Sequence, residues 1–394
     1  MSEALSNRLR VIAICWIAVA GAAFCFILYR HTQVGLTDGT GRPFGDDFIN
    51  YWSGAYLAWH GRVGDIYDWN LFHAFEAATV GADLDFYHYS YPPVLLLLTA
   101  PLAFVPYVPA LFLWTIAGWL CFYAALNAAR PGRATLLLAL ATPAVFVNAI
   151  GGQNGTWTAA LLGGGLTLLE RRPVAAGVLL GLLIYKPQLG ILLPVALIAG
   201  RHFRAITAAA VTVAALVLAS IVVFGVEPWT AYSHNLPVLR HLILEEGVGV
   251  WHRMLSVFVF ARRLGFDVPA SYAVQAIAAL VVAIVVALAW WRDVAAAARN
   301  ALLVLGTMLA TPYLQDYDLV IGAIVVAWLA GISKGGQIPR PLLIAAGLIL
   351  IAPFVAALLA KLTGLEYGPL FIAPAFVIAA RAAPGKAPPR AVVV

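Results

Sequence analysis

Residues 45–67, GDDFINYWSGAYLAWHGRVGDIY, are the stretch around which the rest of the chain is organised. They begin with two adjacent carboxylates, Asp46 and Asp47, and continue with aromatic and small residues at helical spacing, including Tyr51 and Ala55. This acidic, amphipathic stretch follows a long apolar segment of a chain that is otherwise nearly all apolar. We therefore expect polar chemistry to be located here, at the surface of a hydrophobic protein.

The composition predicts a membrane protein. The 394-residue chain is 63% hydrophobic and 11% charged, whereas roughly 25% of the residues of a soluble domain are charged. Many apolar runs approach or exceed the ~20 residues that cross a bilayer as a helix. The net charge of +6 fits basic residues in cytoplasmic loops, and no segment has the pattern of a nucleic-acid-binding surface. The three cysteines all fall within apolar runs, which indicates core residues rather than disulfides or metal ligands.

The distribution of arginine determines the predicted topology. The first apolar run, 11–29, follows Arg8 and Arg10 and predicts an uncleaved anchor. Residues 91–106 are apolar but short and rich in proline, so they could either cross the membrane or form a re-entrant segment. The re-entrant alternative places all three following arginine pairs in the cytoplasm, and the positive-inside rule favours it; these pairs are Arg130/Arg133, Arg171/Arg172 and Arg201/Arg204.

With this choice the sequence predicts an all-α polytopic membrane protein of about twelve transmembrane helices, with both termini in the cytoplasm. The predicted spans are 11–29, 108–128, 134–150, 155–169, 173–185, 188–200, 205–224, 270–291, 298–311, 317–332, 341–360 and 368–381. Two large outer loops, 30–91 and 225–269, connect them, and juxtamembrane helices are expected in the first. Residues 1–383 form one predicted domain, and 384–394 form a disordered cytoplasmic tail.

This topology brings the polar motifs of the chain to the outer side. Besides Asp46 and Asp47, they are HYSYPP (88–93), GGQNG (151–155), YKPQ (185–188) and PYLQDYD (312–318). Together with the second outer loop they supply the candidate substrate-binding residues Tyr91, Gln153, Asn154, Lys186, Gln188, Arg253, Tyr313, Asp316 and Asp318. We expect these side chains to form one site that is open to the outer compartment.

Each motif also has a purely structural interpretation. Asp46 or Asp47 could cap the following helix, and capping would explain one of Asp316 and Asp318 but not both. Gln153 and Asn154 between glycines could form an ordinary turn, and the prolines after Tyr91 could simply shape the backbone. Lys186 could extend its ammonium to the interface, although a charge in an apolar segment is a functional candidate by default.

The second outer loop is basic, and the chain has no recognisable metal signature. Most basic side chains of the loop could be surface residues, but an anionic ligand would use two or three of them; they are His234, Arg240, His241, His252, Arg253, Arg262 and Arg263. No histidine pair has the spacing of a metal site, and GGQNG lacks the lysine and hydroxyl residue of a phosphate-binding loop. We therefore expect no metal and no bound cofactor.

Five segments resemble glycosyltransferase family 87, the polyprenol-phosphate-mannose-dependent mannosyltransferases of the GT-C class. In chain order they are DFINYWSGAYLAWHGRVGDIYD (47–68), YPPVLLLLTAPLAFVP (91–106), GGQNGTW (151–157), GLLIYKPQLGILLPVAL (181–197) and TPYLQDYDLV (311–320). The second outer loop differs, because this chain has HRMLS (252–256) where the family often has an Asn-Gln-Ser stretch. The resemblance implies a GT-C-like fold and a catalytic base in the first outer loop, at Asp47, with Asp46 as the alternative.

The resemblance implies an inner-membrane enzyme that transfers a sugar, with mannose expected, from a polyprenyl-phosphate donor to a glycan or glycolipid acceptor on the periplasmic side. One carboxylate suffices as general base because the leaving group is already a phosphate, and Lys186 or Arg253 could supply positive charge to it. A transporter or lipid-linked-sugar flippase is the alternative, and an envelope scaffold is a third class. The sequence does not determine the oligomeric state.

Overall fold

The computed structural model describes residues 3–39, 41–332 and 338–383 of the chain. Within them the fold is entirely helical, with two isolated β-bridges and no strand. The predicted disordered tail, 384–394, lies outside the described residues.

Five helices are long and apolar enough to cross a membrane. They are α1 (Glu3–Val34), α5 (Tyr107–Ala129), α11 (Phe203–Phe224), α14 (Val268–Trp291) and α17 (Arg340–Thr363). A sixth candidate is broken, because α6 (Arg133–Ala141) and α7 (Pro143–Ile150) meet at an angle of 52°. Pro143 explains this break, since proline cannot continue the hydrogen-bond ladder of the preceding helix.

The other six predicted spans correspond to shorter helices. These elements are α8 (Gly155–Leu168), α9 (Pro173–Gly181), η3 (Leu182–Tyr185), η4 (Pro187–Gly190), α10 (Leu193–Ala199), α15 (Ala296–Ala310), η7 (Asp316–Ile321), α16 (Gly322–Gly331) and α18 (Gly368–Ala382). By length and composition the described residues thus contain five or six membrane-spanning candidates. The count of twelve and the GT-C fold remain predictions.

The two predicted outer loops fold into short helices. The first contains α2 (Phe48–Trp59), η1 (Val63–Ile66) and α3 (Trp69–Val80), and the proline-rich segment after it is broken into α4 (Val94–Leu98) and η2 (Ala100–Phe104). The second contains α12 (Glu227–Leu239), the π-helix η5 (Arg240–Glu245), η6 (Trp251–Arg253) and α13 (Val257–Arg263).

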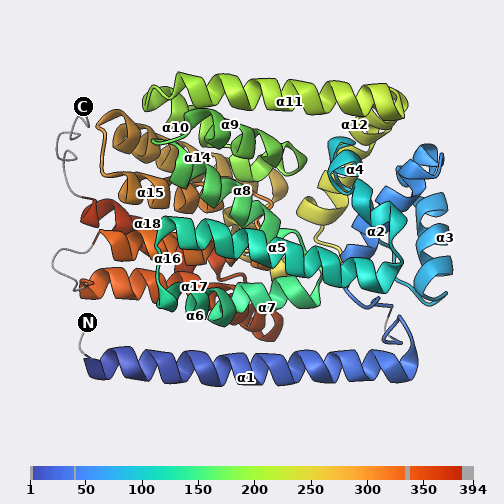
Figure 1. Cartoon of the computed structure of the whole chain (residues 1–394), viewed down its shortest axis with the longest axis horizontal. Helices are drawn as coiled ribbons and strands as arrows, with labels where there is room; N and C mark the ends of the chain where they lie inside the picture. The colour runs from blue at the N-terminus through green and yellow to red at the C-terminus, as the bar shows by residue number, and fades with distance from the viewer. Residues whose placement is uncertain (1–2, 40, 333–337, 384–394) are drawn as a thin grey trace.

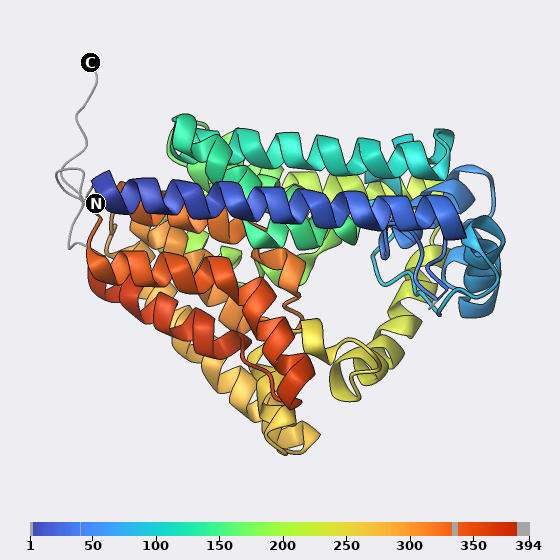
Figure 2. The same cartoon turned by 90° about the horizontal axis from the view of Figure 1, so that it is seen from below.

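These loop helices gather at one end of the molecule. In Figure 1, α2, α3, α4 and α12 lie at the right, whereas α1 begins and α18 ends at the left, and Figure 2 shows the same separation from below. Two hydrophobic cores follow this division. One packs α8, α15, α16 and α18 together, and the other packs α2, α4 and α5 together.

A close contact between α8 and η7 joins residues that are far apart in the sequence. A Cβ atom on Gly155, the first residue of α8, would collide with the carbonyl oxygen of Tyr317. Only glycine lets the two backbones approach this closely. The contact brings Asn154, which precedes α8, beside the acidic residues of η7.

Candidate active site

The turn before α2 directs Asp46 and Asp47 in different ways. Asp46 has a left-handed backbone (φ 44°), which aspartate adopts more readily than most residues. Neither residue caps α2 through its side chain, so the cap expected of Asp46 is wrong. Instead, the Asp46 carboxylate accepts hydrogen bonds from the Tyr87 hydroxyl (2.6 Å) and from Nη1 of Arg253 (3.2 Å).

The GGQNG turn lies directly against these carboxylates. Gly152 has a φ of 50°, and a Cβ there would lie 2.5 Å from Cβ of Phe48, so the turn requires glycine. This close approach presents the Gln153 amide to Asp47, whose Oδ2 accepts a hydrogen bond from Nε2 of Gln153. The turn interpretation of GGQNG is therefore correct, and the turn also orients Asp47.

A hydrogen-bonded chain continues from Gln153 into the protein. The Tyr51 hydroxyl donates to Oε1 of Gln153 (3.4 Å) and lies 2.9 Å from the Tyr91 hydroxyl. Nδ2 of Asn154 donates to the same Tyr91 hydroxyl (3.0 Å). Tyr51 was not among the predicted site residues, although its position four residues after Asp47 places both on one helix face.

This series of hydrogen bonds ends at Lys186, which forms a buried ion pair. Its side chain is only 3% exposed, and Nζ lies 2.5 Å from Oδ1 of Asp318 and 3.0 Å from Oδ1 of Asn154. The ammonium also lies 4.5 Å from the centre of the Tyr317 ring. The other carboxylate oxygen of Asp318 accepts from the backbone N–H of Gln315, which completes a capping box. Lys186 therefore does not reach an interface, and its charge is balanced inside the protein.

Arg253 also lies near the Tyr317 ring, with Cζ 5.7 Å from the ring centre. Its Nε donates to the Asp316 carboxylate (3.1 Å), and its Nη1 donates to Asp46. Burial opposes the charge of the guanidinium, but Asp316, Asp47 and Asp46 together raise the pKa of Arg253 above its usual value. Arg253 therefore links the first outer loop to η7.

Among the described residues, Asp46, Asp316 and Asp318 each pair with a cation, whereas Asp47 forms no ion pair. Burial, followed by the neighbouring charge of Asp46, raises the pKa of Asp47 to about 6, against the opposing effects of Arg253 and the Gln153 hydrogen bond. The residue is half-buried rather than fully enclosed. A carboxylate with a pKa just below neutral is suited to general-base catalysis.

Two predicted residues lie outside this network. Within the described residues, Gln188 forms no hydrogen bond to the network, and its side chain is half-buried in η4. Tyr313 packs instead against the hydrophobic cluster of Leu244, Met254 and Phe258. In the same part of the chain, no group of three or more His, Cys, Asp or Glu side chains is arranged to hold a metal ion.

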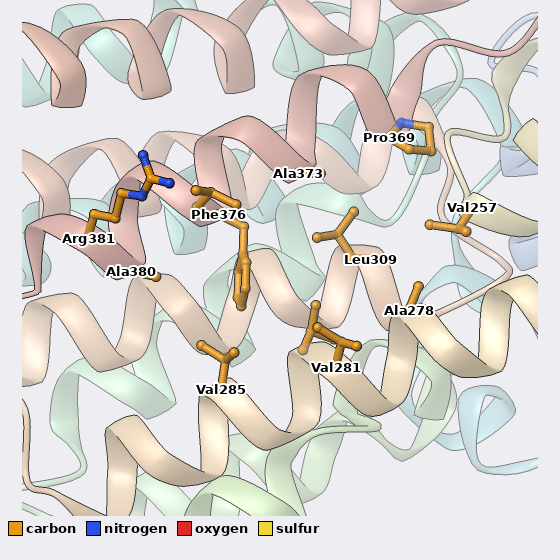
Figure 3. A pocket seen from close by; sticks show the side chains of 12 residues that line it. Val257, Ala278, Val281, Val285, Leu309, Pro369, Ala373, Phe376, Ala380 and Arg381 are labelled. Atoms are coloured by element: carbon orange, nitrogen blue, oxygen red, sulfur yellow. The ribbon is translucent and has the colours of Figure 1, made fainter.

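An apolar groove of about 590 Å³ runs between α14 and α18 (Figure 3). Pro369 and Val257 lie at one end and Arg381 at the other, and Phe376 projects between the helices. Val281 and Val377, which line the groove, are 53% and 44% exposed, so the groove opens to the surroundings of the protein. Its shape and lining suit a long hydrocarbon chain.

Residues 89–312, more than half of the chain, match glycosyltransferase family 87. No curated protein and no solved structure matches the chain. The matched region contains Tyr91, Gln153, Asn154, Lys186 and Arg253, whereas Asp46 and Asp47 precede it and Asp316 and Asp318 follow it.

Proposed function

The chain belongs to glycosyltransferase family 87, and from this premise we propose that it transfers a sugar from a polyprenyl-phosphate donor to an acceptor hydroxyl. Mannose is the proposed sugar, and a glycan or glycolipid is the proposed acceptor. The observation that supports this proposal best is the single polar network at the loop end, in which Asp47 is oriented but lacks a cation partner.

In the proposed reaction Asp47 removes the proton of the acceptor hydroxyl. The acceptor oxygen then forms a bond to the anomeric carbon, while the bond between that carbon and the phosphate oxygen breaks. The phosphate leaves with the electron pair of that bond, so no general acid is required. A single displacement of this kind inverts the anomeric configuration. Asp46 is the alternative base, but its bonds to Arg253 and Tyr87 favour a positioning role.

The network residues hold Asp47 in place in this proposal. Gln153 fixes one carboxylate oxygen, and Tyr51 and Tyr91 fix Gln153. Lys186 was expected to bind the donor phosphate, and that expectation remains a prediction. Because Asp318 already balances its charge, we propose that Lys186 mainly positions Asn154.

The proposed membrane arrangement follows from the distribution of the elements. The enzyme would be a multi-pass protein of the inner membrane, with both termini in the cytoplasm and the loop end facing the periplasm. The gathering of the loop helices at the end opposite the start of α1 and the end of α18 supports this orientation. The α14–α18 groove would hold the polyprenyl chain of the donor at bilayer depth.

The decisive experiment incubates the purified protein, in liposomes, with radiolabelled polyprenyl-phosphate mannose and candidate acceptors. Radiolabel in a glycan or glycolipid product supports the glycosyltransferase function. With the Asp47→Asn variant, the radiolabel should remain in the donor. Movement of the donor lipid between leaflets without transfer would instead support the flippase. The absence of both sugar transfer and lipid movement would support the scaffold. Other sugar donors then test the choice of mannose.

A further inference from the structure

Three basic side chains at the loop end form no ion pair with any carboxylate of the described residues. Arg42 precedes α2, Arg263 is the last residue of α13, and Lys361 lies in the last turn of α17; all three are exposed. We call them the rim cations. Within the described ranges none of them forms an ion pair, whereas Lys186 and Arg253 are both paired.

Two of the rim cations, Lys361 and Arg263, belong to elements or side chains in contact with η6, the short helix of His252. α17 packs against η6, which carries His252, and Cζ of Arg263 lies 5.0 Å from the centre of the neighbouring Trp251 ring. Burial of the imidazole is the largest cause of its low pKa, about 4, and the charges of the rim cations and Arg253 lower it further. The three cations, from three separate elements, therefore act on one position.

The positive charge at this rim is not cancelled by Glu366, which lies close to Arg263. Glu366 is buried, and burial raises its pKa to about 8, so its carboxyl group is mostly neutral at pH 7. Arg253 is already held by Asp316 and Asp46. The rim cations therefore leave uncompensated positive charge next to the candidate site, which attracts anions.

The rim also lies next to the outer end of the apolar groove. Val257, the first residue of α13, lines the groove, and Arg263 ends the same helix six residues later, about 9 Å away along its axis. Pro369, which lines the groove at the same end, follows Lys361 after a short connection between α17 and α18. A molecule with an anionic head and an apolar chain could therefore contact both.

We propose that the rim cations and His252 form the phosphate subsite of a lipid phosphate whose hydrocarbon chain lies in the α14–α18 groove. This inference rests on the proposed function and assigns the donor phosphate to residues other than Lys186. When the bond from the sugar to the phosphate oxygen breaks, the phosphate gains one negative charge, and the acceptor proton moves to Asp47. The rim cations stabilise that growing charge, so they favour the transition state over the bound donor.

Calorimetric titration of the purified protein with a short-chain prenyl monophosphate, in an uncharged detergent, tests the inference. We expect the monophosphate to bind at least about tenfold more tightly than the matching prenol. Removing one exposed charge, in Lys361→Gln or Arg263→Gln, is expected to weaken binding about three- to tenfold. Lys361→Arg should restore binding, and Arg62→Gln, a surface arginine paired with Asp65, should leave it unchanged.

Two results would overturn the inference: equal binding of prenol and prenyl monophosphate, or wild-type binding by Arg263→Gln/Lys361→Gln with an unchanged melting temperature. Inorganic phosphate binding as tightly as the prenyl monophosphate would show a site for free phosphate and remove the lipid from the proposal. These binding results do not depend on transfer. A wild-type protein that binds prenyl phosphate but never transfers sugar would refute the proposed function and leave this subsite standing.

Discussion

Lys186 and Arg299 are both buried cations beside an aromatic ring, and each has a partner next to one of the two ends of α8. α8 begins next to Asn154, the partner of Lys186, and Glu170, a partner of Arg299, follows its end. Arg299 also binds Asp293 (2.7 Å) and lies 4.8 Å from the centre of the Trp290 ring. The two clusters therefore share their chemistry but not their surroundings.

The difference lies in the carboxylates. At the Arg299 end, Glu170 and Asp293 are 30% and 64% exposed, so water solvates them. At the Lys186 end, Asp318 is 1% exposed and belongs to a network that continues through Asn154 and Gln153 to Asp47. The Arg299 cluster needs only paired charges to hold its helices together, and we call it the structural clamp. A catalytic site also needs one carboxylate that neutral partners hold in place.

The most severe test of this comparison is Asp47→Asn. We expect transfer to fall by roughly 10²- to 10⁴-fold, because a general base contributes about that much, while the melting temperature stays unchanged. Asp65→Asn, the same change in a half-buried residue of the same loop that is paired with Arg62, should retain full activity. An active Asp47→Asn together with an inactive Asp46→Asn would transfer the role of base to Asp46.

Lys186→Met is the second test. It leaves Asp318 buried without a cation, which typically costs about 3–5 kcal/mol of unfolding free energy. Thermal unfolding in detergent measures this loss. The double variant Lys186→Met/Asp318→Leu should recover most of the stability, because no unpaired charge remains. A single variant as stable as the wild type would mean that the pair is not buried as described.

The pH dependence of kcat/KM examines Asp47 itself. Asp47 must be ionised to accept a proton and its pKa is about 6, so kcat/KM should be constant above that pH and fall about tenfold per unit below it. Gln153→Leu removes a hydrogen bond that favours the ionised form, so the fall should begin at a higher pH. Gln188→Leu, a change of the same kind outside the network, should not move it.

The smallest effect is expected for Arg299→Met. Because Glu170 and Asp293 are partly solvated, losing the cation should cost only about 1 kcal/mol, again measured by thermal unfolding. The kcat of the folded fraction should be unchanged. A large loss of kcat with normal stability would show that the Arg299 cluster is coupled to the Lys186 network. The Arg299 cluster would then not be purely structural.

The helices that the sequence predicts best are those formed by uninterrupted apolar runs. The predicted span 205–224 corresponds to α11 (Phe203–Phe224), and 341–360 corresponds to α17 (Arg340–Thr363). The bend inside 134–150 was not predicted, because hydropathy averages over a window and does not register one proline at position 143. The membrane positions of the shorter helices depend on packing that a single sequence does not contain.

The motifs of the candidate site could be predicted from the sequence, but the hydrogen bonds and ion pairs between them could not. Positive-inside reasoning placed GGQNG, YKPQ and PYLQDYD on one side, and the structure brings Gln153, Lys186 and Asp318 into one network. Local rules could not identify the partner of Lys186, which lies 132 residues away. They also favoured a cap for Asp46, whose actual partners, Tyr87 and Arg253, are distant in sequence.

The separation of Lys186 and Asp318 also has a consequence for biosynthesis. At about 5–20 residues per second, roughly 7–26 s pass between the synthesis of Lys186 and that of Asp318, 132 residues later. During this interval the ammonium has no carboxylate partner, and an unpaired charge in an apolar segment is costly. The ion pair of Lys186 therefore cannot form until the chain has been made as far as Asp318, late in its synthesis.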